Sequence, residues 1–327
     1  SGYEVKKDRL SPHLVTYLPM DTRWNAQKFL RLVQPRLALF VKYEVWPNFF
    51  RELGKSGVPI LLISAIFRRR QAYFKWYGCF LKKALSRVAH FYVQDTRSAD
   101  LLGELGIQET TISGDTRFDR VLEILEDPKE LPFMEDFRGN RTCLVCGSTW
   151  PEDHELLLPF IDSADKGFCF VIAPHKTDHK TIEALQKGIQ QPTALYSRRK
   201  DTHLRDSTVL IVDTIGLLTQ IYRYAHLAYV GGGFATGLHN TLEPAVFGIP
   251  VLIGPQYQGF REAEELVAAG GIRVVRDAAE CALEAGGLMA NPGLRADLGS
   301  INKMYIEKNK GASVQILAGI RRLLSRP

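Results

Sequence analysis

Residues 229–255 of this chain read YVGGGFATGLHNTLEPAVFGIPVLIGP. The apolar run that ends at Val230 predicts a buried strand, and the apolar run before the final Gly-Pro predicts another. Between them stands a turn of three glycines, Gly231, Gly232 and Gly233. Because glycine has no side chain, the backbone N–H groups of such a turn can closely approach a phosphate or a sugar. The stretch predicts a strand–turn–helix–strand unit of an α/β fold, although the three glycines alone are equally compatible with an ordinary turn.

A short helix is predicted to follow the turn and to start near Leu242. Asn240 or Thr241 can cap it, and a helix N-terminus carries partial positive charge that suits a nucleotide phosphate. Glu243 in the first turn is placed to accept hydrogen bonds from two neighbouring ribose hydroxyls. His239 is either a structural loop residue or a further contact to the same ligand. The pattern predicts a nucleotide-sugar site.

Apolar runs alternate with helical patterns along the rest of the chain, which is typical of doubly wound sheets of parallel strands. In the first half, strands are predicted near 37–41, 59–64, 91–94 and 110–113, with helices near 25–33, 47–55 and 98–105. In the second half, strands are predicted near 143–146, 168–173, 209–212, 227–230 and 251–253, with helices near 152–161, 180–187, 216–224 and 262–269. A polar segment with two prolines, 127–132, is the predicted linker.

We therefore expect two Rossmann-like domains with a cleft between them, 1–130 and 131–327. A helical region at about 292–324 is able to cross back onto the first domain. A chain of 327 residues exceeds the usual single core, and its 45% hydrophobic content is typical of globular proteins. No apolar run reaches the roughly 18 residues that span a bilayer. The net charge of +6 suggests an anionic partner: a nucleotide, a nucleic acid or an acidic lipid surface.

The five cysteines are odd in number and scattered through apolar segments, which suits a reducing compartment. Cys143 and Cys146 have the CxxC spacing of metal and redox sites. They lie in a strand-like run without a second pair, so neither role is favoured.

Several motifs resemble those of one enzyme family, the Kdo transferases, which move 3-deoxy-D-manno-octulosonic acid (Kdo) from CMP-Kdo to the lipid A precursor. HNTLEPAVFGIPVLIGP resembles the family's HNxLEPAxxGxPVxxGP signature. The segments 42–48 (KYEVWPN), 114–119 (GDTRFD), 147–149 (GST) and 260–262 (FRE) resemble, in the same order, its ETEhWPN, GNxKFD, GST and NFxE motifs. One segment departs from the pattern: APHK falls where the family has PRHPER, so that His175 or Lys176 holds the place of the arginine.

The resemblance implies a GT-B glycosyltransferase, inverting, metal-independent and without a cofactor. Its donor would be CMP-Kdo and its acceptor a lipid A precursor of the lipid IVA type. The donor contacts that it implies are Gly147, Ser148, Thr149, His175, Lys176, Gly232, Gly233, His239, Asn240, Thr241 and Glu243. It places the enzyme at the cytoplasmic face of the bacterial inner membrane. Because the chain opens at Ser1 without an initiator Met, we expect a fragment, with a membrane anchor and the family's catalytic glutamate (GExxA) upstream.

Glu44 is the candidate for chemistry in the first half, because it follows a predicted strand and precedes a helix that starts at Pro47. A carboxylate at the carboxyl end of a strand can act as a general base or orient one, but it can also merely cap the helix. Ser64 is either an acceptor contact or a strand-terminal turn residue. The GST loop offers hydroxyl and N–H groups to a phosphate or a sugar carboxylate, or simply caps the next helix. His175 with His179 could suggest a metal site, but a cationic contact to the donor is favoured.

The stretch 68–88, RRRQAYFKWYGCFLKKALSRV, contains seven cations, five aromatics and no acid. As one helix it would align aromatic side chains on a stripe with cations beside it, which suits an anionic lipid surface. The predicted lipid or acceptor contacts are Arg69, Lys75, Trp76 and Lys82. The stripe could instead pack on its own sheet. Nucleic acid is not favoured, since no nucleic-acid-binding module surrounds the stretch.

Two other functions remain open from the sequence. One is a different GT-B enzyme, such as a hexosaminyltransferase or a sugar-nucleotide epimerase. The other is a non-catalytic piece that binds a nucleotide or adapts to a membrane.

Overall fold

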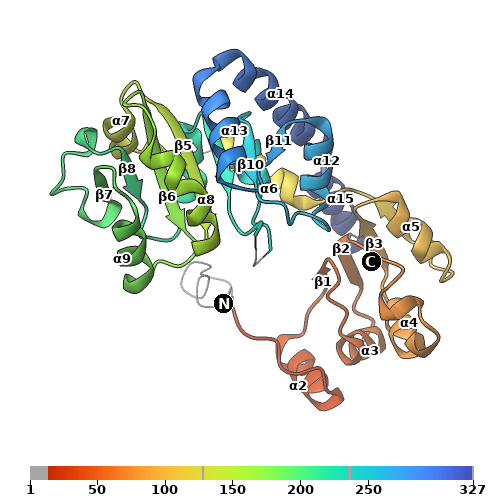
Figure 1. Ribbon diagram of the computed structural model, residues 1–327. Helices are drawn as coiled ribbons and strands as arrows, with labels where there is room; N and C mark the ends of the chain where they lie inside the picture. The colour runs from red at the N-terminus through yellow and green to blue at the C-terminus, as the bar shows by residue number, and fades with distance from the viewer. Residues whose placement is uncertain (1–13, 127–128, 235–236, 326–327) are drawn as a thin grey trace. The chain divides into compact units, whose positions relative to one another are not determined.

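The computed structural model describes residues 14–126, 129–234 and 237–325, and it contains two compact α/β units (Figure 1). The first unit is Ser1–Thr116 together with Gly311–Pro327, and the second is Arg117–Lys310. The predicted linker at 127–132 lies within the second unit, and residues 127–128 are outside the described ranges. No helix of the described part is long and apolar enough to cross a membrane.

The first unit is built on a four-stranded parallel sheet in the order β1-β2-β3-β4. Its strands are β1 (Ala38–Val41), β2 (Ile60–Ala65), β3 (His90–Val93) and β4 (Thr110–Ile112). Its helices are α2 (Arg23–Val33), α3 (Pro47–Lys55), α4 (Cys79–Leu85), α5 (Thr96–Gly103) and α15 (Ala312–Leu324). Strand β2 is buried on both faces, which is why it reads as an unbroken apolar run.

The last helix, α15, covers one face of this first sheet. Its Ile316 packs with Leu61 and Tyr92 of the sheet, whereas α3, α4 and α5 pack on the opposite face. The approach is close at Gly319, where a Cβ atom would lie 1.6 Å from the hydroxyl oxygen of Tyr92. Glycine is therefore required there for the helix to lie against the strand.

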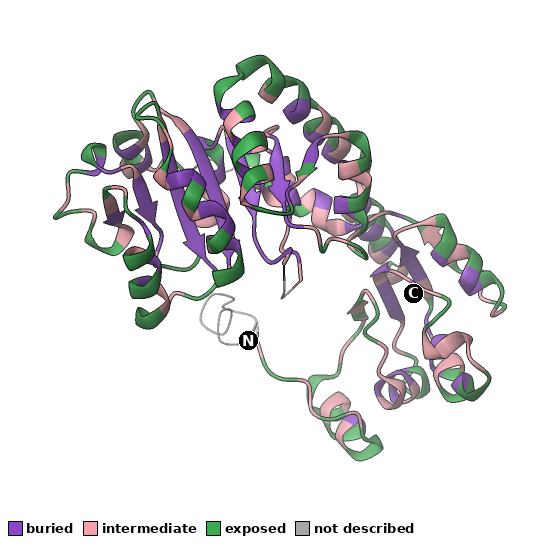
Figure 2. Cartoon of the chain, viewed as in Figure 1, coloured by how far each residue is buried: buried purple, intermediate pink, exposed green. Residues whose placement is uncertain are grey.

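The second unit contains a seven-stranded parallel sheet in the order β11-β10-β9-β5-β6-β8-β7. Its strands are β5 (Thr142–Thr149), β6 (Phe168–Pro174), β7 (Thr193–Leu195), β8 (Val209–Ile211), β9 (Leu227–Val230), β10 (Val251–Ile253) and β11 (Ile272–Val274). Its helices are α6 (Thr116–Glu126), α7 (Pro132–Arg138), α8 (Pro151–Asp162), α9 (His179–Gly188), α10 (Leu218–Ile221), α11 (Leu242–Ala245), α12 (Arg261–Ala269), α13 (Ala278–Ala290) and α14 (Pro292–Asn309). The strands are buried while the outer helix faces are exposed (Figure 2).

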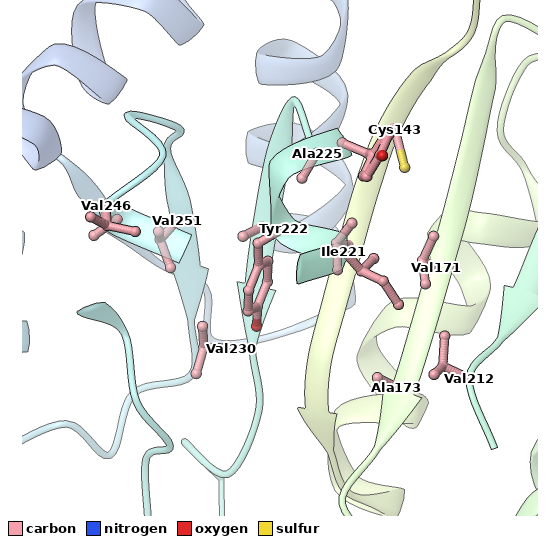
Figure 3. Close-up of a cluster of buried hydrophobic side chains, with 14 of the residues drawn as sticks. Cys143, Val171, Ala173, Val212, Ile221, Tyr222, Ala225, Val230, Val246 and Val251 are labelled. Atoms are coloured by element: carbon pink, nitrogen blue, oxygen red, sulfur yellow. The ribbon is translucent and has the colours of Figure 1, made fainter. Parts of the chain in front are cut away.

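Helices cover both faces of this second sheet. On one face, α8, α9 and α13 pack on Leu144, Phe170 and their neighbours. On the other, α7, α10 and α12 pack on a cluster that includes Val171 and Val230, and Figure 3 shows Ile221 and Tyr222 beside these side chains. Because side chains alternate along a strand, Cys143 and Cys146 point to opposite faces. They therefore do not form a CxxC site.

The structure corrects the predicted helix over 68–88. The stretch forms two single 3₁₀ turns, Ala72–Phe74 and Trp76–Gly78, and then the short helix α4. The chain folds back on itself at Gly78, where a Cβ atom would lie 1.9 Å from the carbonyl oxygen of Ala72. The aromatic stripe is consequently divided: Tyr73 packs on Phe67, and Trp76 is 88% exposed.

Other elements also differ from the prediction. The predicted helix at 216–224 is the four-residue α10 followed by a 3₁₀ turn, Tyr222–Tyr224. The helical region at 292–324 is two helices, α14 and α15, separated at Gly311, whose φ of 104° is left-handed. Helices α6, α7 and α13 and strands β7 and β11 are not among the predicted elements.

Candidate functional site

Two of the predicted loops meet at the carboxyl end of the second unit's sheet. Strand β5 ends in Gly147, Ser148 and Thr149, and the glycine turn follows β9. The two strands are direct neighbours, and Gly147 pairs with Val230. Open parallel sheets bind their ligands at the carboxyl ends of the strands. The GST loop and the glycine turn therefore form one candidate site.

The glycines of the turn are required by the packing of the chain itself. A Cβ atom on Gly231 would lie 2.4 Å from the carbonyl oxygen of Ser148. Gly232 has a φ of 91°, and a Cβ atom on it would lie 2.3 Å from the carbonyl oxygen of Gly237. A Cβ atom on Gly233 would lie 2.7 Å from the Cα atom of Gly254. The ordinary-turn interpretation thus explains why these residues are glycines, whether or not a ligand approaches them.

A buried carboxylate that is not among the predicted site residues holds this site together. Asp153 in the first turn of α8 has no exposed surface. Its Oδ2 accepts hydrogen bonds from the backbone N–H groups of Trp150 (2.8 Å) and Gly232 (3.1 Å), and its Oδ1 accepts one from the hydroxyl of Tyr229 (2.7 Å). Burial, and next the charge of Asp153, raise the pKa of Tyr229. The N–H of Gly232 is therefore already bonded within the protein.

The sequence signal for this carboxylate is the string Trp-Pro-Glu-Asp at 150–153. An acid three residues after the N-cap can accept from the N-cap backbone, and proline favours the first helical position. The helix begins in that way, with Trp150 as the N-cap. The alternative in which a GST hydroxyl caps the helix is wrong.

Three aromatic rings from separate loops gather beside the glycine turn. His175 stacks on Trp150, with ring centroids 4.5 Å apart and planes 19° apart, and on His239 at 4.6 Å and 28°. The rings of Trp150 and His239 are nearly parallel, at 11°. The ammonium of Lys176 lies 5.4 Å from the centre of the Trp150 ring, within cation–π range. His175, Lys176 and His239 were predicted from the sequence, whereas Trp150 was not.

The electrostatics of this cluster favour neutral imidazole at His239. Burial lowers its pKa most, and the neighbouring His175 lowers it further, while Asp153 acts in the opposite direction. Two stacked histidines cannot readily both be charged. A bound anion would relieve this repulsion, so the cluster suits a ligand with phosphate or carboxylate groups.

The GST loop is tightly held. The Thr149 hydroxyl lies 2.9 Å from Nε2 of His154, and Thr149 is buried. Burial lowers the pKa of His154. Ser148 has a left-handed φ of 54°, and a Cβ atom on Gly147 would lie 2.0 Å from the hydroxyl oxygen of Tyr222. The Thr149 side chain is thus engaged internally, while the partly exposed Ser148 keeps an unusual conformation.

The loop after β6 carries the cationic candidates. His175 and Lys176 are exposed, and the His175 backbone N–H donates to the carbonyl oxygen of Thr149. Asp178 caps α9 by accepting from the backbone N–H of Thr181. Across the described residues no group of three or more His, Cys, Asp or Glu side chains is arranged to hold a metal ion.

Glu243 is held at both carboxylate oxygens. Oε2 accepts from the hydroxyl of Thr219 (2.9 Å) and Oε1 from the side-chain amide of Asn240 (3.1 Å). The helix starts at Leu242, as predicted, but α11 has only four residues. Thr241 is its N-cap without a capping side-chain bond, and the Thr241 hydroxyl is buried with no partner among the described residues. Asn240, whose Oδ1 accepts from the Leu242 N–H, is the residue that caps the helix start.

An ion pair joins the 114–119 and 260–262 motifs. The Arg117 guanidinium bonds both carboxylate oxygens of the buried Glu262, at 2.7 and 3.1 Å. The pair fastens the start of α6 to the first turn of α12. Both residues lie in the second unit, so this pair organises that unit.

Glu44 lies in the first unit, after β1. It is exposed, and its Oε2 accepts a hydrogen bond of 2.9 Å from the indole N–H of Trp46. Helix α3 is capped instead by Asp21, whose carboxylate accepts from the backbone N–H groups of Asn48 and Phe49. The interpretation of Glu44 as a helix cap is therefore wrong. Burial, and next the charge of Glu44, raise the pKa of Tyr73, so Glu44 lies near the aromatic stretch 68–88.

Ser64 does not face solvent. It is fully buried, with a left-handed φ of 48°. Its hydroxyl oxygen lies 2.9 Å from that of Thr116 and accepts from the Thr116 backbone N–H at 3.2 Å. The structure supports the turn interpretation and corrects the predicted acceptor contact.

The 68–88 stretch presents an aromatic surface that we call the Trp76 surface: Trp76, Tyr77 and Phe80, each more than 60% exposed. Lys75 and Lys82 lie beside it in sequence and are half-buried. Arg69 differs, because its guanidinium forms a two-point ion pair with Glu104.

The fold is GT-B, two α/β domains with parallel sheets. It matches the structure of UDP-GlcNAc 2-epimerase from Neisseria meningitidis bound to UDP-GlcNAc, with a TM-score of 0.64 at 17% identity over 92% of this chain and 80% of that one. At that identity the match concerns the fold alone.

The sequence comparisons find similar proteins in one enzyme family. The sequence model described as 3-deoxy-D-manno-octulosonic-acid transferase (kdotransferase) matches residues 1–120. The 3-deoxy-D-manno-octulosonic acid transferase of Chlamydophila psittaci is 29% identical over 83% of this chain and 64% of its own length. That of Haemophilus influenzae is 26% identical over 95% of this chain and 75% of its own. The chain is related to the Kdo transferases, which confirms the resemblance of the motifs, and it spans just under two thirds of the Chlamydophila relative.

Proposed function

We propose that this protein is a glycosyltransferase that transfers Kdo from CMP-Kdo to a lipid A precursor in lipopolysaccharide synthesis. One observation carries the proposal. The GST loop and the glycine turn meet at the carboxyl ends of neighbouring strands, in a chain whose relatives are named Kdo transferases. The loop after β6 joins them through the stacked rings of Trp150, His175 and His239.

The donor would bind to this site in the second unit. Glu243 keeps lone pairs on both oxygens beyond those used by Thr219 and Asn240, so it can accept from ribose hydroxyls while held in place. His175 and Lys176 are exposed cations or donors that suit the phosphate of CMP or the carboxylate of Kdo. In this proposal they, rather than a metal ion, stabilise the charge that develops on the departing CMP.

The acceptor would bind to the first unit. In an inverting transfer, the acceptor hydroxyl loses its proton as it attacks the anomeric carbon and CMP departs from the opposite face. Glu44 is an exposed carboxylate at the end of a strand, which suits a general base or a residue that orients one.

The Trp76 surface would contact the lipid acceptor or the membrane that contains it. Exposed aromatic side chains with neighbouring lysines suit the boundary between anionic headgroups and acyl chains. The proposed location is the cytoplasmic face of the inner membrane.

The test compares donors on the same protein. Calorimetry on this chain should detect binding of CMP but weaker binding of UMP. Incubation of the full-length protein, which would supply the upstream catalytic glutamate that the resemblance implies, with CMP-Kdo and lipid IVA should yield a Kdo-containing lipid. Binding of UDP-GlcNAc with epimerisation, and no transfer from CMP-Kdo, would instead assign the chain to the sugar-nucleotide epimerases that share the fold. Nucleotide binding with neither reaction would support a non-catalytic module.

A further inference from the structure

The indole of Trp150 forms a hydrogen bond whose direction is fixed by chemistry. Its Nε1 lies 3.1 Å from Nε2 of His239, and the two ring planes are only 11° apart. Indole nitrogen is a donor and never an acceptor, so Nε2 of His239 must be the acceptor. The two rings are thus nearly parallel and joined by this bond, and His175 stacks on both.

This bond decides which tautomer His239 adopts. An imidazole nitrogen that accepts a hydrogen bond has no proton, so the single proton of a neutral His239 is on Nδ1. Neutral imidazole in water prefers the other tautomer, with the proton on Nε2. No hydrogen bond from Nδ1 to another described residue is present. The Nδ1–H therefore has no acceptor among the described residues and can donate to a ligand.

Trp150 is itself rigidly placed. It is the N-cap of α8, and its backbone N–H donates to the buried Asp153, which also holds the N–H of Gly232 in the glycine turn. The backbone N–H of His239 donates to the carbonyl oxygen of Gly231 in the same turn. Both partners of the indole–imidazole bond are thus fixed to one framework.

We propose that Trp150 is a positioning residue for the nucleotide-sugar donor: it holds His239 in the Nδ1-protonated tautomer, so that Nδ1–H donates to an anionic oxygen of the donor. This inference rests on the proposed function for the identity of the anion. The tautomer itself does not depend on that function. Trp150 need not contact the donor, because it acts through His239.

The test replaces Trp150→Phe, which keeps an aromatic ring beside His175 and Lys176 and removes the indole N–H donor. In a long-range ¹H–¹⁵N spectrum of the unliganded protein, His239 should be Nδ1-protonated in the wild type and mainly Nε2-protonated in W150F. The His239 signals are assigned by their loss in His239→Gln. Trp24→Phe, in the first unit and 66% exposed, is the matched control and should change neither tautomer nor ligand affinity.

Ligand binding gives the second readout. Because the competent tautomer becomes a minor population, the apparent affinity of W150F for CMP should fall about fivefold, while its weaker affinity for cytidine, which lacks the phosphate, should stay unchanged. A wild-type His239 protonated on Nε2, or an unchanged CMP affinity in a W150F protein that has switched tautomer, would overturn the inference. A wild type that has the expected tautomer but binds no CMP would overturn the anion contact and the proposed function together, and leave the role of Trp150 in fixing His239 intact.

Discussion

The hydroxyl of Thr219 donates a hydrogen bond of 2.9 Å to Oε2 of Glu243. The side-chain amide of Asn240 donates one of 3.1 Å to Oε1 of the same carboxylate. Glu243 is half-buried, and its carboxylate is positioned by its neighbours before any ligand arrives. Such preorganisation lowers the entropy cost of binding.

Replacing Glu243→Ala should therefore weaken CMP binding by about 1–3 kcal/mol, the usual value of hydrogen bonds to a charged group. Thr219→Val should cost less, because it removes only one of the two bonds that orient the carboxylate. Calorimetry on each variant measures the effect. Glu307→Gln, an exposed glutamate on α14, is the control and should bind CMP like the wild type. Equal affinity in the Glu243 variant would remove this residue from the donor site.

Asp153 should be important for stability as well as for binding. Asp153→Asn replaces one acceptor oxygen by an N–H₂ group that must face either Tyr229 or the two backbone N–H donors. A mismatched buried donor costs about 1–3 kcal/mol or more, and urea unfolding should show a loss of that order. Asp165→Asn, on an exposed turn, should leave the unfolding midpoint unchanged. If Asp153→Asn is equally harmless, the carboxylate does not hold the glycine turn.

The contrast between the strands and Asp153 illustrates what the sequence could predict. Strands β5, β6 and β9 are buried on both faces, so their apolar runs were recognisable without any partner, and the GST and HNTLE motifs placed the two loops. The bonds of Asp153 join residues 76 and 79 positions apart, and no local pattern encodes such contacts. The 68–88 stretch differs from its helical periodicity: it forms two 3₁₀ turns before α4, and Gly78 approaches the carbonyl oxygen of Ala72 too closely for a side chain.

Substitutions at Glu44 and at Asp21 should have different effects, one on turnover and the other on stability. Asp21→Ala should destabilise the protein by about 0.5–2 kcal/mol, because it removes the acceptor for the first N–H groups of α3. Glu44→Ala should leave stability unchanged and, in the full-length protein, lower turnover at least about a hundredfold if Glu44 is a general base or its partner. Unfolding curves and transfer rates per folded molecule measure both. Retained turnover in Glu44→Ala would exclude Glu44 from the chemistry.

Stability should decrease in mild acid. Burial lowers the pKa values of His154 and His239 below 6.5, so between their folded pKa values and 6.5 the unfolded chain binds more protons than the folded one. Their contribution is complete above pH 6.5 and is lost as the pH falls below it. His154→Gln, which can still bond to Thr149, should make the free energy of unfolding less dependent on pH between 7.5 and 5.5. An unchanged slope would show that His154 protonates equally in both states.

The Trp76 surface should bind anionic lipid through two separable forces. Replacing Trp76 and Phe80 by Ser should weaken binding at any salt concentration, because it removes apolar contact with the membrane. Lys75→Glu with Lys82→Glu should weaken binding mainly at low salt, because charges are least screened there. Arg69→Glu would also break the ion pair with Glu104, so it must be compared with Glu104→Gln, which removes the partner alone. Sedimentation with phosphatidylglycerol liposomes measures binding, and CMP affinity, which depends on the second unit, should not change. Undiminished sedimentation in the folded Trp76 and Phe80 variant would mean that these side chains do not contact the membrane.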